Sequence, residues 1–162
     1  MTMRQNVIIG AALAARQGSG AMNAADYFVL ALADRMAELF PSAAVYTNPQ
    51  RQGAVLPAVF VTVYHSTAQQ ALGGAVSVEF QAEVSYLAPE PLDAGELSGA
   101  LSAMIETPHE LPTEIGIFEL RGRSAAADAV EGRAQMLCRA GARLYVPNND
   151  ALMQNLVQGV DL

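Results

Sequence analysis

Few residues of this chain have side chains that could act as nucleophiles or metal ligands. The sequence contains one cysteine, Cys138, and two histidines, His65 and His109, which lie far apart along the chain. Metal sites and catalytic triads need several such groups that converge on one point. Cys138 falls on the apolar side of an alternating segment, where a small core residue is expected. We therefore predict no catalytic residue, no metal site and no cofactor.

Two glutamates, Glu79 and Glu83, share one side of a predicted strand. Four residues at about 3.3 Å each separate their Cα atoms by about 13 Å. That distance exceeds the roughly 5 to 9.5 Å between the paired carboxyl groups of glycosidases. Gly73-Gly74 lacks the further glycines and the Lys-Ser/Thr of a phosphate-binding loop. We interpret the glutamates as a solvated or salt-bridged face of the strand.

Arg139 and Arg143 repeat the four-residue spacing of the two glutamates, on the polar side of the last predicted strand. The two charge pairs could be neighbours within one sheet, where an exposed pair is worth at most about 1 kcal/mol. They could instead fix the register between subunits. The sequence leaves both alternatives open.

The composition is apolar and acidic, which argues against several classes of function. Hydrophobic residues make up 52% of the 162 residues, and nine arginines against sixteen acids leave a net charge of −7. This charge argues against nucleic-acid binding as the main function. The apolar run at residues 7–15 is less than half of the roughly 20 residues that span a bilayer, so no membrane association is predicted. A single cysteine requires no oxidising compartment, and synthesis in the cytosol is expected.

Two capped helices are predicted. Asn23 and Asp26 have the spacing of a capping box, and the helix that follows ends before a proline. Its apolar face carries Phe28, Leu32, Met36 and Leu39. Asp93 and Glu96 form a second cap signature, ahead of apolar residues at helical spacing as far as about Glu106.

Strands are predicted where apolar residues alternate or run together. Residues 76–86 and 133–146 alternate, and the further candidates are 43–47, 58–64 and 114–123. The continuous apolar run at 58–64 favours a strand covered on both faces. Residues 65–75 are expected to form a projecting loop. The predicted fold class is α+β, with a mainly antiparallel sheet of about five strands, two helices packed on one face, and N- and C-terminal arms.

Both ends of the chain are predicted to lie outside the core domain of residues 22–147. Residues 1–21 are expected to form an arm on a hinge, because Gly18 and Gly20 follow a short helical segment at 5–16. Residues 148–162 are expected to form a docking tail that is too short to be a stable helix alone. Contacts with other subunits or partners are predicted at Val7, Ile8, Leu13, Glu79, Glu83, Arg121, Arg123, Arg139, Arg143, Leu152, Leu156 and Val157.

Residues 27–147 resemble the tail terminator (tail-completion) proteins of long-tailed bacteriophages. The segments that carry the resemblance run from Leu39-Phe40-Pro41 through Val45-Tyr46-Thr47, Leu56-Pro57-Ala58-Val59-Phe60-Val61, Leu87-Ala88-Pro89 and Leu120-Arg121-Gly122-Arg123 to Ala142-Arg143-Leu144-Tyr145-Val146. The resemblance implies a structural virion protein and not an enzyme. It further implies a homo-oligomeric ring, usually six-fold, that caps the tail tube, stops its polymerisation and binds the head–tail connector protein. DNA would pass through such a ring without being read, at the neck end of a tail made in the bacterial host cytoplasm.

Two alternatives stay open. A neck or head-completion adaptor of a phage would also form a ring, but it would bind at the portal end. A ligand-binding or catalytic α+β domain would instead need a cleft, for which the candidates are Tyr46, Tyr64, Glu83, Tyr86 and Arg121. Co-assembly with tail tube or portal protein separates the first two readings, and a monomer with a deep polar cavity would favour the third.

Overall fold

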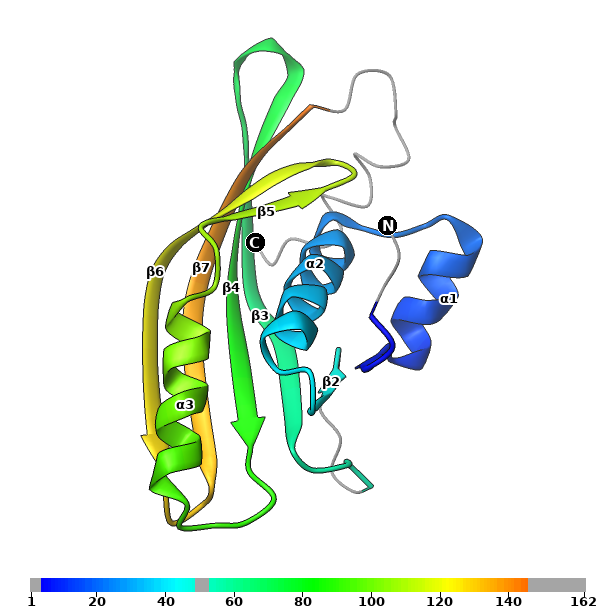
Figure 1. The fold of residues 1–162 in the computed structure, drawn as a ribbon. Helices are drawn as coiled ribbons and strands as arrows, with labels where there is room; N and C mark the ends of the chain where they lie inside the picture. Colours follow the sequence, from blue (N-terminus) through cyan, green and yellow to red (C-terminus); the bar gives the residue numbers. More distant parts are fainter. Residues whose placement is uncertain (1–3, 49–52, 146–162) are drawn as a thin grey trace.

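The computed structural model of the chain describes residues 4–48 and 53–145, which build one curled mixed sheet with helices against it (Figure 1). The sheet has seven strands in the order β1-β2-β3-β4-β7-β6-β5. The strands are β1 (Val7–Ile8), β2 (Ala44–Tyr46), β3 (Ala58–Gln70), β4 (Ala75–Leu87), β5 (Glu110–Thr113), β6 (Gly116–Asp128) and β7 (Arg133–Tyr145). The helices are α1 (Ala11–Ser19), α2 (Ala24–Leu39) and α3 (Ala94–Ile105), with a short 3-10 turn, η1 (Leu72–Gly74).

The α+β class is therefore confirmed, while the expected count of about five strands and two helices is wrong. The additional strands are β1 and β5, and the third helix, α1, corresponds to the short helical segment expected in the N-terminal arm. The sheet is also less antiparallel than expected, because β1 pairs parallel with β2 and β2 parallel with β3. The other strand pairs are antiparallel.

The alternation predicted for β4 and β7 is confirmed, and it decides which face of the sheet is covered. The buried side chains of these two strands are Val76, Val78, Phe80, Ala82, Val84, Tyr86, Ala134, Met136, Cys138, Ala140, Ala142 and Leu144. They face α2 and α3, which lie on the same side of the sheet in Figure 1. Three aromatic rings lie at the centre of this core, with Phe28 of α2 5.6 Å from Phe80 and 5.2 Å from Phe118 between ring centroids.

Both predicted helix caps are present. The Asn23 side chain accepts a hydrogen bond from the Asp26 backbone N–H, and the Asp26 carboxylate accepts one from the Asn23 N–H. Asp93 accepts from the Glu96 N–H at the start of α3. These bonds satisfy backbone donors that have no partner within the helix, which fixes where each helix begins.

The loop expected at residues 65–75 is wrong, because β3 continues to Gln70 and forms a long hairpin with β4. The pairing holds from Ala58 opposite Leu87 to Gln70 opposite Val76, with a bulge between Val63 and His65. Polar residues fill this part of β3 because the hairpin extends beyond the helices at the top of Figure 1. Backbone pairing, rather than apolar burial, defines the strand there.

The expectation that residues 58–64 are covered on both faces is also wrong. Val59 and Val61 are fully buried toward α2, while Phe60 is half-buried and Tyr64 is 52% exposed. A run of β-branched residues fits a pleated, half-buried surface equally well, so continuous apolarity did not distinguish the two cases.

The second half of the sheet differs from expectation at both ends of β6. Residues 110–113, which lie in none of the predicted strands, form β5 and pair with residues 116–119. Residues 124–128, beyond the predicted end of the strand at 114–123, extend β6 opposite β7. A tight turn at residues 129–132 then joins the two long strands, with Gly132 at a φ of 67°.

The helix expected at residues 5–16 is wrong in its limits, because Val7–Ile8 is the edge strand β1. The backbone N–H of Val45 donates to Asn6 O at 2.8 Å, and that of Thr47 donates to Ile8 O at 3.1 Å. Helix α1 begins after Gly10 and ends at Gly20, whose φ of 73° gives the left-handed C-cap. Leu152, Leu156 and Val157 of the predicted docking tail lie outside the described residues.

The open sheet face as a candidate functional site

The face of the sheet opposite α2 and α3 carries most of the charged residues predicted as contacts. We call it the open face and define it by the outward side chains of the central strands: Tyr64, Glu79, Gln81, Glu83, Glu119, Arg121, Leu137, Arg139 and Arg143. None of these side chains is buried, whereas the residues that alternate with them in β4 and β7 are buried. These side chains of the open face are therefore accessible to solvent.

The structure places the two charge pairs on neighbouring strands of one sheet. Arg139 of β7 lies opposite Gln81 of β4, and Arg143 lies opposite Ser77. The glutamates are offset from them by two residues, with Glu83 opposite Leu137. Among the described residues no salt bridge joins the arginine pair to the glutamate pair.

Glu83 instead accepts hydrogen bonds from two residues of the same sheet. Its Oε1 atom accepts from Arg133 Nη2 at 3.3 Å and from Ser85 Oγ at 2.8 Å. These two bonds hold the Glu83 carboxylate against its own sheet. The contact between subunits that the sequence suggested for Glu79 and Glu83 stays a prediction.

Two glycines receive the guanidinium groups of arginines from the adjacent strand. A Cβ atom built on Gly141 would lie 2.9 Å from Cζ of Arg121, and one built on Gly122 would lie 3.3 Å from Nη2 of Arg139. Each arginine therefore lies close over a position that has no side chain. Arg121 also approaches Glu119 at 3.6 Å. Arg121 and Arg139 are therefore exposed cations whose guanidinium groups lie close to the backbone of the open face.

Arg123 has a different role from the other arginines, because it closes the end of α3. Its guanidinium donates to the carbonyl oxygens of Ile105, at 2.9 Å, and Thr107, and Nη2 lies 2.9 Å from His109 Nδ1. The C-terminal carbonyl groups of a helix lack partners and carry partial negative charge, so an arginine stabilises them. The Arg123 guanidinium therefore already has its hydrogen-bond partners within its own subunit.

The arm residues predicted as contacts are divided between surface and interior. Val7 and Ile8 lie in the edge strand β1, and Ile8 is 40% exposed. Leu13 points inward from α1 and is only 7% exposed. Asn6 fixes the start of this segment, because its Nδ2 atom donates to Ala43 O at 2.9 Å and lies 3.3 Å from the carbonyl oxygen of Phe40.

Cys138 is a core residue, as predicted. It is 2% exposed, and burial raises the pKa of its thiol to about 11, with a smaller opposing contribution from Arg123. A thiol with a raised pKa is protonated at neutral pH and is a poor nucleophile. Within residues 4–48 and 53–145, no group of three or more histidine, cysteine or acidic side chains could hold a metal ion.

The five residues considered for a ligand cleft do not converge. Tyr86 lies on the covered side of β4, and Glu83, three residues earlier, lies on the open face. The Tyr86 hydroxyl donates to Glu96 Oε1 at 2.6 Å, and burial, followed by this hydrogen bond, raises its pKa. The Tyr46 hydroxyl is 2.9 Å from the Val55 N–H, which donates to it. The cleft proposed from the sequence is therefore not formed by these side chains.

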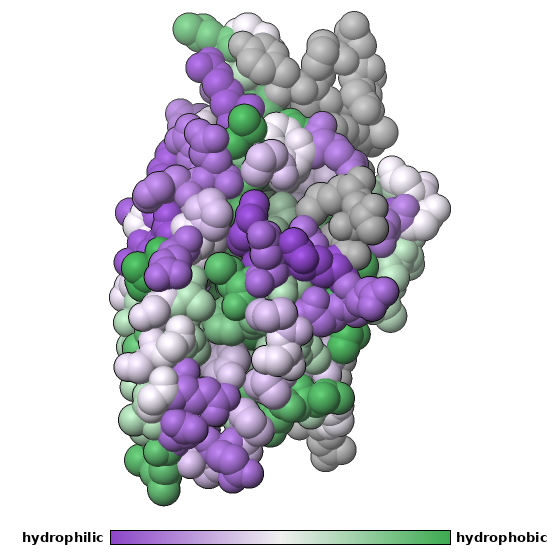
Figure 2. Space-filling model, viewed as in Figure 1, coloured by the Kyte–Doolittle hydropathy of each residue, from purple (hydrophilic) through white to green (hydrophobic). Residues whose placement is uncertain are grey.

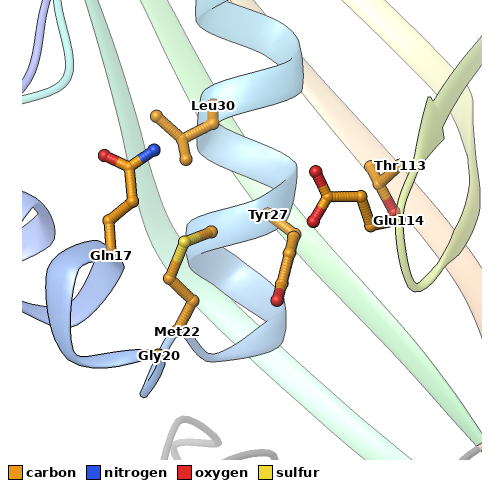
Figure 3. A pocket seen from close by; sticks show the side chains of 7 residues that line it. All are labelled: Gln17, Gly20, Met22, Tyr27, Leu30, Thr113 and Glu114. Carbon is orange, nitrogen blue, oxygen red and sulfur yellow. The ribbon is translucent and has the colours of Figure 1, made fainter. Parts of the chain in front are cut away.

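A small pocket on the helix side was not anticipated from the sequence. It has a volume of about 220 Å³ and is lined by Gln17, Gly20, Met22, Tyr27, Leu30, Thr113 and Glu114. Figure 3 shows the side chains of Met22, Tyr27 and Leu30 around one space, with the Glu114 carboxylate on the side of the β5–β6 turn. Its residues come from segments that only the fold brings together, which is why no local sequence pattern indicated it.

The fold and the open face together define an α+β domain whose mixed sheet is covered by helices on one side and charged on the other. A family model described as "Phage tail terminator protein" matches residues 29–147, well over half of the chain. The chain belongs to the phage tail terminator family. A search of curated proteins finds no match.

The family assignment confirms the resemblance seen in the sequence and covers almost the same residues. Membership in this family makes the chain a structural component of the phage tail, and thus of the virion. The match begins within α2 and leaves β1 and α1 outside it. No helix in the described part of the chain is long and apolar enough to cross a membrane.

Proposed function

We propose that this chain forms a closed ring of six copies that caps the completed tail tube, stops its polymerisation and joins the tube to the head connector. The observation that carries the proposal is the family match over residues 29–147. A subunit at such a junction needs separate surfaces for its neighbours in the ring, for the tube and for the connector. The charged open face of the sheet on one side, and the helices that cover its other side, supply two different surfaces.

The outer edge of β6 supports assembly. Strand β5 pairs with residues 116–119 only, and the His109 carbonyl accepts from the Leu120 N–H at 2.7 Å. Beyond that point, residues 121–128 have no strand on their outer side in the part of the chain that the structure describes. An unpaired strand edge presents backbone donors and acceptors that another chain can pair with.

The acidic balance of the chain supports the passage of DNA without binding. With a net charge of −7 per copy, six copies would carry a strongly negative total charge that does not favour adhesion to phosphates. DNA therefore moves through the proposed ring and is not read.

Light scattering of the purified chain tests the ring. We expect one mass, close to six times 17.1 kDa, over a wide range of concentrations. A monomer at every concentration would contradict the proposal. Electron microscopy of the same sample should show closed particles with a central channel.

A polymerisation assay tests the capping role. Added to growing tubes of the tail tube protein, the chain should stop their elongation and remain at one end. Joining to the connector protein should follow only after capping. Binding to the portal protein without any effect on tube growth would instead identify a neck adaptor.

A further inference from the structure

One end of the molecule carries exposed apolar side chains surrounded by acids. Leu92, in the β4–α3 loop, is 71% exposed, and Val130, in the β6–β7 turn, is 77% exposed. The exposed acids beside them in the sequence of these two loops are Glu90, Asp93, Asp128 and Glu131. We call these six residues the end knob. Figure 2 shows green and purple atoms next to each other at the lower end of the molecule, where Figure 1 places these loops.

The end knob is held in shape by hydrogen bonds. The Asp128 carboxylate accepts from the backbone N–H of Val130, at 3.0 Å, and of Glu131, at 3.3 Å. The Leu92 N–H donates to Ala129 O at 2.8 Å, which ties the two loops together. Leu92 has a φ of 70°, a left-handed conformation that is strained for leucine and places its side chain in solvent. Such strain persists only where surrounding contacts maintain it, and it is frequent at functional surfaces.

The open face contains a shallow groove that carries a basic side chain where the end knob carries acidic ones. It has a volume of about 340 Å³, and its lining includes Tyr64, Gln81, Gly122, Ser124, Leu137 and Arg139. Tyr64 is 52% exposed and Leu137 is 43% exposed, so two apolar side chains face solvent here as well. Arg139 lies over Gly122 and makes no salt bridge with any described residue. We call this the face groove.

We propose that the end knob of one copy docks in the face groove of the next copy. The apolar side chains of the knob would cover Tyr64 and Leu137, and Glu131 would meet Arg139. This inference rests on the proposed ring and specifies which two surfaces form it.

Two arguments favour a second copy as the occupant. First, the groove places two exposed apolar side chains, Tyr64 and Leu137, beside the exposed cation Arg139. The knob of the same chain offers exposed apolar side chains with anions, so the two surfaces are complementary in charge and in hydropathy. Second, the knob lies at one end of the strands and the groove lies on a face of the sheet, so the contact joins two different surfaces. Contacts of this kind repeat from copy to copy and form a ring where the rotation between copies closes.

Charge reversal on each surface tests the docking. Glu131→Arg and Arg139→Glu, each alone, should raise the concentration needed for assembly by more than about ten-fold, because like charges then meet. Glu38→Arg is the matched control. It reverses an exposed acid on the surface of α2, which lines neither the end knob nor the face groove, and should leave assembly unchanged. Light scattering and circular dichroism would report mass and folding.

Mixing the two variants provides the decisive measurement. The reversed knob of Glu131→Arg matches the reversed groove of Arg139→Glu, and the unchanged knob of the second variant matches the unchanged groove of the first. Equal amounts of the two folded, unassembled variants should therefore form rings together, and a chain that carries both substitutions should form them alone. Rings that persist in both single variants, or variants that fail to assemble when mixed, would overturn the docking. A monomeric wild-type chain would instead overturn the ring itself.

Discussion

The guanidinium of Arg16 and the carboxylate of Asp26 meet at two points, with Nε 2.7 Å from Oδ2 and Nη2 2.8 Å from Oδ1. Asp26 is 5% exposed and also belongs to the capping box of α2. The hydrogen bond with Asp26 raises the pKa of Arg16, so the guanidinium stays charged at any ordinary pH. This contact fastens α1 to the first turn of α2.

Replacing Arg16 by alanine should destabilise the protein by about 1 to 3 kcal/mol, because a buried carboxylate loses a charged donor. The Arg16 side chain is 39% exposed, which keeps the expected loss below that of a fully buried pair. Urea denaturation would measure it. Arg35→Ala is the control, since its pair with Glu38 lies on the surface of α2 and should cost no more than about 0.5 kcal/mol. Equal losses in the two variants would contradict this assignment.

Arg123→Gln should weaken the C-terminal end of α3. The substitution removes charged donors from the carbonyl groups of Ile105 and Thr107, at a cost of about 1 to 3 kcal/mol. Compared with the wild type, the variant should show faster amide hydrogen exchange in the last turn of α3, with a smaller increase in β7. Arg143 is an exposed arginine with no salt bridge to the described residues. Arg143→Gln should therefore leave both the unfolding free energy and the hydrogen exchange of α3 unchanged.

Gly99→Ala should stabilise the protein by about 0.5 to 1 kcal/mol, because alanine restricts the unfolded chain and favours helix. Gly99 is exposed within α3, and a Cβ atom there would meet no atom within 4 Å. Gly132→Ala should have the opposite sign, since the residue has a φ of 67° and its Cβ would lie 3.3 Å from Pro91 Cα. Melting temperatures of the two variants, compared with the wild type, would decide the signs.

The stability of the fold should fall at alkaline pH partly through Cys138. Its pKa is raised to about 11 in the folded protein, whereas a thiol in an unfolded chain has a pKa of about 8.5. Below that lower value both states are protonated and stability is unaffected. As pH rises from there to about 11, the unfolded state loses its proton first and is favoured. Cys138→Ala should show a shallower decline of unfolding free energy over this range, and an identical decline would contradict the prediction.

Local signals in the sequence were sufficient for the elements that depend on them. The caps at Asn23 and Asp93 fixed the starts of two helices, because a side chain that bonds its own backbone needs no tertiary context. The alternation along β4 and β7 identified the core face, because every second side chain of a strand points the same way. The charged residues of the open face were named for the same reason.

Elements that depend on distant partners were not predictable from local patterns. Strand β1 has two residues and exists because it pairs with β2, with Val7 opposite Val45. The position of Arg121 over Gly141 depends on the register shift between Leu120 and Arg123 in the β6–β7 pair. The end knob joins two loops that are separated by helix α3 and two strands. Each of these features follows from tertiary pairing, which outweighs local propensity.

Strand β7 is the last described strand along the chain, yet it lies between β4 and β6 near the middle of the sheet. A chain emerging from the ribosome can form the β3–β4 hairpin early. The backbone groups on the other edge of β4 then have no strand to pair with until residues 133–145 have been made. Helices α2 and α3 likewise have no complete sheet to pack against before β7 is present. The central part of the sheet can therefore be completed only after residues 133–145 have been made, and the risk of misassociation is greatest just before that step.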